Sequence, residues 1–122
     1  MKLETAKTPW MMVLVQEDPC QSPRPAEAVR IAAGVGAWQQ VVVLIYLQGP
    51  AVRLLDRDDE ELVDGDVLAL AWPVVSEFNH PVYVDSASPW LKTIGTPALN
   101  FQEISPANLQ ELISKCQAVL RF

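Results

Sequence analysis

The sequence predicts an α/β protein, a three-layer α/β/α sandwich around a mostly parallel five-stranded sheet. Short apolar runs of strand length alternate along the chain with helical patterns. Two of these runs, residues 11–15 and 41–47, are apolar without interruption, as in strands buried on both faces of a parallel sheet. With 122 residues, half of them hydrophobic, the chain has room for one core. We therefore expect an N-terminal tail over residues 1–9 and a single domain over residues 10–122.

The first strand is expected over residues 11–15 and should lie centrally in the sheet. A Pro-rich turn follows it, and Pro25 suits the first turn of a helix, where its missing N–H costs nothing. Gly34 and Gly36 predict the end of this helix. Residues 41–47 form the second strand, because they are dense in β-branched side chains.

Residues 51–55 predict a short helical turn, and the acidic stretch that follows predicts a loop. Asp66 is a plausible N-cap for a helix over residues 67–78. Pro73 lies inside that helix and should kink or divide it. A strand over residues 67–72 is the alternative interpretation.

The last part of the chain continues the alternation of strands and helices. A third strand is expected over residues 81–85, then a turn and helix over 86–95. A fourth strand is expected near residues 99–104. A helix over residues 106–115 has Pro106 at its first position, and a final strand covers residues 118–122.

Composition and charge exclude several classes of function. The net charge of −6, with no basic patch, argues against nucleic-acid binding. No apolar run is long enough to span a bilayer, and no signal region follows the first residues, so we expect a cytoplasmic protein. The two cysteines lie far apart and there is one histidine, so the sequence indicates neither a disulfide nor a metal site. Without a GxGxxG or Walker motif, no nucleotide or other cofactor is expected.

Two stretches carry a resemblance to a known family. They are VVVLIYLQGPAV, residues 41–52, and LQELISKCQAVLRF, residues 109–122, within the strand and helix order described above. The chain resembles the DsrE/DsrF/DsrH-like sulfur-relay family, which includes the Tus-type tRNA-thiolation relay subunits. The resemblance implies a homo-oligomer, from dimer to hexamer. It also implies a cysteine that carries sulfur as a persulfide and passes it between a donor and an acceptor protein.

The chain departs from this family at the position of the sulfur-carrying cysteine. The resemblance places that cysteine just after the third strand, where residues 82–88 read VYVDSAS. A serine cannot hold a transferable persulfide, because the chemistry needs a thiolate leaving group. Any activity would therefore be sulfurtransferase-like at most.

Cys20 is then the candidate catalytic residue, as a persulfide acceptor after the first strand. Helix N-terminal amides and Arg24 would lower the pKa of its thiol, and Glu17 and Asp18 would raise it. Inert packing in the turn is the alternative interpretation for Cys20. For Cys116 inert packing is the expectation, and for His80, at the amino end of the third strand, a surface or packing role.

The predicted ligand-binding cleft lies where the first three strands end, since ligands bind at the carboxyl ends of parallel strands. Its expected lining is Glu17, Asp18, Gln48, Gly49, Asp85 and Ser86. Helix capping is the alternative role for Asp85 and Ser86. The sequence thus predicts a small DsrE-like protein that accepts sulfur or binds a small ligand, and the alternative is a non-catalytic binding or assembly subunit. Trp38, Trp72 and Trp90 are expected to pack helices or to line a subunit interface.

Overall fold

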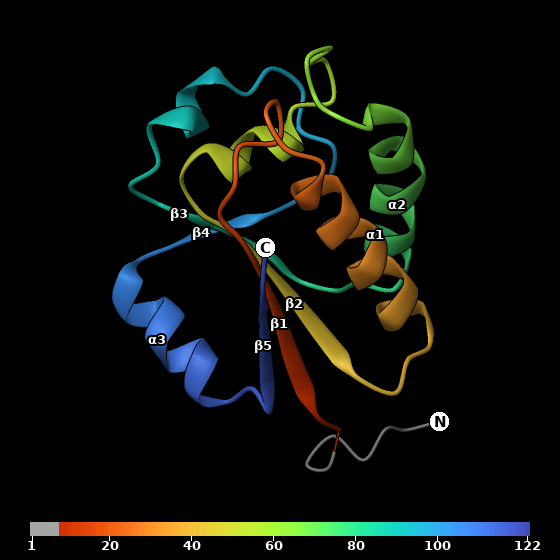
Figure 1. Ribbon diagram of the computed structural model, residues 1–122. Helices are drawn as coiled ribbons and strands as arrows, with labels where there is room; N and C mark the ends of the chain where they lie inside the picture. Colours follow the sequence, from red (N-terminus) through yellow and green to blue (C-terminus); the bar gives the residue numbers. More distant parts are fainter. Residues whose placement is uncertain (1–7) are drawn as a thin grey trace.

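The computed structural model describes residues 8–122, and its fold is the predicted sandwich (Figure 1). Most of the predicted tail, residues 1–7, lies outside the described residues. The strands are β1 (Trp10–Val15), β2 (Val42–Leu47), β3 (Val82–Asp85), β4 (Gln102–Ile104) and β5 (Ala118–Arg121). They pair in parallel throughout one five-stranded sheet.

The sheet has the order β4-β3-β2-β1-β5. β1 is an interior strand, as predicted, with β2 on one side and β5 on the other, but the middle position belongs to β2. Trp10 lies opposite Val42 and Met11 opposite Ala118. Because β1, β2 and β3 are neighbours and parallel, the segments that follow them gather at one edge of the sheet, at the top of Figure 1. We call this edge the carboxyl edge.

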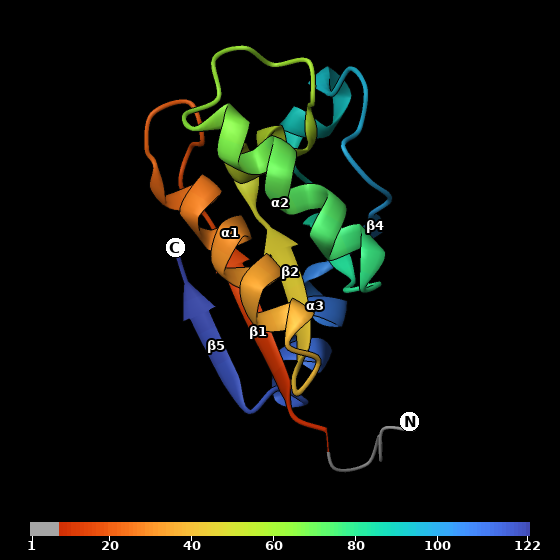
Figure 2. The same cartoon turned by 90° about the vertical axis from the view of Figure 1, so that its right-hand side faces the viewer.

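Helices cover both faces of the sheet, because the buried strands present apolar side chains on each (Figure 2). α1 (Arg24–Ala37) and α2 (Gly65–Glu77) pack on the face formed by Val13, Val15 and their neighbours. α3 (Pro106–Ser114) packs on the opposite face, where Met12 and Leu14 contact the cluster around Leu109. The uninterrupted apolar runs in the sequence reflect this coverage on two sides.

The start of α1 is as predicted, with Pro25 in its first turn, but its end is not. Gly34 and Gly36 lie inside the helix, which continues to Ala37. Gly36 does not end the helix; it leaves space for a neighbouring side chain. A Cβ atom built on it would lie 2.4 Å from His80 Nε2. The imidazole of His80 therefore packs directly on the helix backbone.

α2 is one uninterrupted helix, so Pro73 does not divide it and the alternative strand is wrong, while the predicted kink stays a prediction. Pro73 is exposed, and on the solvent side of a helix water can satisfy the carbonyl that loses its partner. The N-cap is Asp64, in the left-handed conformation with φ 58°, and not Asp66. Asp66 lies in the first turn, where the helix dipole favours a carboxylate. Among residues 8–122, no helix is both long and apolar enough to cross a membrane.

The predicted helical turn over residues 51–55 is present and begins earlier, at Gly49, whereas several other elements are shorter than predicted. η2 (Gly49–Leu55) and η3 (Pro89–Thr93) are 3-10 helices, so the segment 86–95 contains no α-helix. β4 begins only at Gln102, and Pro97, before it, forms an isolated antiparallel bridge with Asp56. α3 begins as predicted, with Pro106 in its first turn after the N-cap Ser105.

Candidate functional site

Two hydrogen bonds connect the ends of the first three strands at the carboxyl edge. Gln16 Nε2, after β1, donates to Gln48 Oε1, after β2, at 3.1 Å. Ser88 Oγ, after β3, donates to the carbonyl oxygen of Gly49 at 3.0 Å. Gly49 has φ +56°, a conformation that glycine adopts without strain. The predicted convergence of these three strand ends is therefore present.

Around Cys20 the chain forms a cluster of charges centred on Arg53, which η2 supplies. We call it the Arg53 cluster: Asp18, Cys20, Arg53, Asp59, Glu61 and Trp90. The guanidinium lies 3.6 Å from Asp18 Oδ1, 3.2 Å from Asp59 Oδ2 and 3.5 Å from Glu61 Oε1. Its Cζ atom lies 4.7 Å from the centre of the Trp90 ring, a cation–π distance. One cation thus joins the end of β1, the acidic loop and η3.

The thiol of Cys20 is half-buried and faces a carboxylate. Its Sγ lies 3.8 Å from Asp59 Oδ2, and its backbone N–H donates to Asp18 Oδ1 at 2.9 Å. Burial, and then the negative charge of Asp59, raise the pKa of Cys20 to about 11, and Arg53 opposes this only in part. The thiol is consequently protonated at neutral pH, and only the thiolate is a strong nucleophile.

Only some of the groups predicted to shift the pKa of Cys20 do so. Asp18 does raise its pKa, but Arg24 is engaged elsewhere: its Nε lies 3.2 Å from Glu17 Oε2, and its guanidinium lies over Phe122. The charges of Asp59 and Arg53 affect the pKa of Cys20 more strongly than that of Asp18 does. The sequence pattern did not predict either contact, because both residues follow Cys20 by more than 30 positions. The available signal was Arg53 itself, the single charge in the apolar stretch 49–55.

Asp85 and Ser86 make local contacts after β3. Asp85 Oδ1 accepts from the Ala87 N–H at 2.9 Å, and the Ser86 N–H donates to the Ile104 carbonyl at 3.0 Å. The capping residue of η3 is Ser88, a buried serine whose Oγ accepts from the Trp90 N–H at 3.2 Å. Burial and the charge of Asp85 raise the pKa of Tyr46 to about 12. The ligand-binding role of Glu17, Asp18, Gln48, Gly49, Asp85 and Ser86 stays a prediction.

Both cysteines are free. Cys116 Sγ donates to the Leu112 carbonyl at 3.3 Å, and burial raises the pKa of this thiol, as suits a packed side chain. Cys20, Asp59 and Glu61 offer ligand atoms that lie within 4.8 Å of one another. These three residues fit a metal ion poorly, because Arg53 already pairs with both carboxylates.

A cavity of about 510 Å³ adjoins the Arg53 cluster and shares Asp59 with it. We call it the Trp72 pocket. Its apolar lining is Leu54, Leu62, Leu68, Ala69, Trp72, Pro73 and Ala98. Asp56, Arg57 and Asp59 are its charged lining residues. The pocket lies between η2, the acidic loop and α2, at the carboxyl edge where the predicted cleft was expected but beyond the residues predicted to line it.

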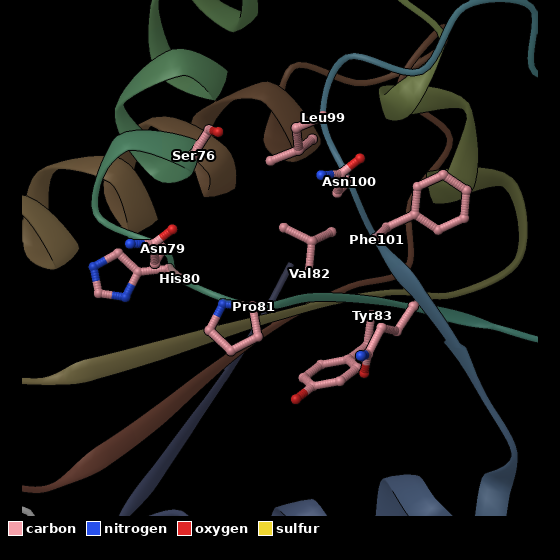
Figure 3. A pocket seen from close by; sticks show the side chains of 10 residues that line it. Ser76, Asn79, His80, Pro81, Val82, Tyr83, Leu99, Asn100 and Phe101 are labelled. Atoms are coloured by element: carbon pink, nitrogen blue, oxygen red, sulfur yellow. The ribbon is translucent and has the colours of Figure 1, made fainter.

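A smaller cavity, of about 270 Å³, lies at the amino end of β3 (Figure 3). Figure 3 shows Asn79 and His80 on one side of Val82, with Leu99 and Asn100 on the other. His80 has the predicted packing role: its Nδ1 accepts from the Val43 N–H at 3.4 Å, and its Nε2 is buried against Gly36. This cavity lies at the edge opposite the Arg53 cluster, and among the described residues no Asp, Glu, Lys or Arg lines it.

Of the three tryptophans with a predicted packing or interface role, Trp72 and Trp90 pack within the subunit. Trp72 is buried, and its Nε1 donates to the Leu54 carbonyl at 3.2 Å. Trp90 is half-buried beneath Arg53. Trp38, at the end of α1, leaves 66% of its surface exposed, so it packs no helix within the subunit. An interface role for Trp38 stays a prediction.

The chain therefore belongs to the class of α/β/α proteins with a five-stranded parallel sheet and a polar carboxyl edge. Among solved structures it is similar to the YchN protein from E. coli, with a TM-score of 0.78 and 14% sequence identity. The match covers 93% of this chain and 99% of that one. At this identity it shows the fold alone, which is the fold that the DsrE-like resemblance implied. No protein-family model and no curated protein matches the sequence.

Proposed function

We propose that this chain is a DsrE-like binding subunit that works at its carboxyl edge and does not carry sulfur on Cys20. The observation that carries the proposal is the surroundings of the thiol: three carboxylates share one guanidinium around it, and its pKa is about 11. An acceptor thiolate must attack the outer sulfur of a donor persulfide, form the new S–S bond and release the donor thiolate. Because the pKa of Cys20 is raised from 9.0 to about 11, its thiolate fraction at neutral pH is smaller than that of an ordinary thiol, which disfavours this step.

The residues after β3 support the same proposal. Where the family resemblance implies a sulfur-carrying cysteine, Ser88 instead donates to Gly49 and caps η3. The residue is 6% exposed, so its hydroxyl stabilises the loop and is not presented to a reactant. Binding at this edge needs no thiolate and remains compatible with all of these contacts. Cytoplasmic location and assembly with further copies of the chain are parts of the same proposal.

The test is to incubate the native protein with a low-molecular-weight persulfide at neutral pH and to locate adducts by peptide mass spectrometry. We expect no gain of about 32 Da, the mass of one sulfur atom, on Cys20. The same protein unfolded in urea is the positive control, because its cysteines have ordinary pKa values and should be modified. Asp59→Asn tests the cause, since it removes the nearest negative charge and should make native Cys20 more reactive. A stoichiometric persulfide on native Cys20 that passes to an added thiol would overturn the proposal in favour of sulfur relay.

A further inference from the structure

The Trp72 pocket has the size and lining of a small-molecule site. Ligand pockets typically enclose about 300–1,000 Å³ and are lined mainly by apolar side chains with a few polar groups. The volume of about 510 Å³ and the seven apolar lining residues fall within that description. Trp72 contributes a ring that is 4% exposed, and its N–H is already bonded to the Leu54 carbonyl. The apolar floor therefore suits a hydrocarbon or aromatic body.

Backbone pairing fixes one wall of the pocket. The Ala98 N–H donates to the Leu55 carbonyl at 2.8 Å, and the Arg57 N–H donates to the Thr96 carbonyl at 3.1 Å. These bonds hold Ala98 against the start of the acidic loop. Because the cavity is bounded in this way by α2, η2 and the paired segments, it fits a compact molecule better than an extended peptide.

The chain segment that contributes Asp56, Arg57 and Asp59 to the pocket is acidic. Residues 56–66 contain seven acidic side chains and one basic side chain, Arg57, which gives the segment a net charge of −6. Within the described residues 8–122, the segment makes two ion pairs: Asp59 and Glu61 each pair with Arg53. Asp56 lines the pocket, is half-buried and takes part in none of them. Arg57 is exposed, so solvent screens its single charge.

We infer that the Trp72 pocket binds a small organic cation, an amine carried on an apolar or aromatic body. The body would contact the apolar floor, and the ammonium group would lie at the Asp56 side of the rim. The same rim disfavours phosphates, carboxylates and nucleotides, because like charges repel. This inference rests on the proposed function, since it names the ligand class of the same carboxyl edge.

Binding is tested with three probes that share one ring system: naphthalen-1-ylmethylamine, the neutral naphthalen-1-ylmethanol and the anionic 1-naphthoate. Chemical shifts of the backbone amides and of the Trp72 indole N–H report both affinity and place. We expect the amine to bind at least about fivefold more tightly than the alcohol, the contribution of one partly enclosed ion pair. The carboxylate should bind most weakly, and the amine preference should shrink in about 0.5 M salt.

Three variants locate the site. Ala69→Phe places a ring in the pocket from an exposed position of α2, so the fold is kept and all probes should lose binding. Asp56→Asn should reduce the preference for the amine over the alcohol severalfold. Asp66→Asn is the matched control: it removes one charge from the same acidic segment but from outside the pocket lining, and should leave that preference nearly unchanged.

Equal binding of amine and alcohol, or tighter binding of the carboxylate, would overturn the inference. So would equal effects of Asp56→Asn and Asp66→Asn, because the attraction would then come from the diffuse charge of the loop. Failure of the proposed function has a different signature, a transferable persulfide on Cys20. Probes that leave the pocket empty while Cys20 stays unmodified would reject the ligand class alone.

Discussion

Replacing Gly36 by alanine should destabilise the protein, although alanine is the better helix former. The added Cβ would lie 2.4 Å from Nε2 and 2.5 Å from Cδ2 of His80, where non-bonded heavy atoms prefer about 3.5–4.0 Å. The ring has little freedom to retreat, because its Nδ1 accepts from the Val43 N–H and its Nε2 is buried. Overpacking of this kind costs about 1–3 kcal/mol.

Gly34→Ala is the matched control, two positions away in the same helix. A Cβ on Gly34 meets nothing within 4 Å, so this variant should gain part of the roughly 0.8–1.0 kcal/mol by which alanine exceeds glycine in a helix. Since both substitutions share that gain, the difference between them measures the clash. We expect Gly36→Ala to be less stable than Gly34→Ala by about 1–3 kcal/mol.

The assay is urea denaturation followed by far-UV circular dichroism, with the slope unchanged between variants. In a His80→Ala background the clash disappears, so there Gly36→Ala should behave like Gly34→Ala. Equal stability of the two alanine variants in the natural background would refute the close packing of His80 on α1.

Four further predictions concern the carboxyl edge. Alkylation of native Cys20 should follow a midpoint near pH 11, and Asp59→Asn should move that midpoint down. The pKa of Cys20 in the folded protein exceeds its ordinary value of 9.0, so the contribution of the protonated thiol to stability is complete below about pH 9 and is lost as the pH rises toward about 11. Urea denaturation at several pH values should therefore show that the difference in unfolding free energy between the natural protein and Cys20→Ala becomes smaller over this range. Ser88→Ala should cost about 1–3 kcal/mol in the same melts, since it leaves the Gly49 carbonyl without its hydroxyl partner and uncaps η3, whereas the exposed Ser86→Ala should cost little. Trp72→Phe should cost about 1–2 kcal/mol by removing the donor to the Leu54 carbonyl, and an unchanged midpoint would show that this bond is dispensable.

The sequence predicted most of the fold because its strands are short, apolar and separated by proline and glycine. The buried runs 11–15 and 41–47 have no competing interpretation once their length excludes helices. The errors came from local rules that tertiary contacts override. Gly36 resembles a helix terminator and is instead a packing site, and Pro73 resembles a helix breaker but lies on the solvent side of α2.

The candidate site was less predictable, because its chemistry depends on contacts between distant segments. The position of Cys20 at the end of β1 followed from the strand pattern, but its protonation depends on Asp59, which is 39 positions later. For the acidic stretch, residues 56–66, the sequence predicts only a loop. Only the fold shows that the loop returns over Cys20 and, through Asp56 and Asp59, lines the Trp72 pocket.

Arg53 links the two proposals. If Cys20 were a working thiol, Arg53 would be its activator, since it is the one group among those acting on Cys20 that lowers its pKa. The guanidinium is instead shared among Asp18, Asp59 and Glu61 and lies over Trp90. These contacts attach the acidic loop to η2 and η3. That loop supplies the carboxylates at the rim of the Trp72 pocket. The same contacts that keep the thiol protonated therefore form the negative rim of a binding site, and for this reason we favour binding over sulfur transfer at the carboxyl edge.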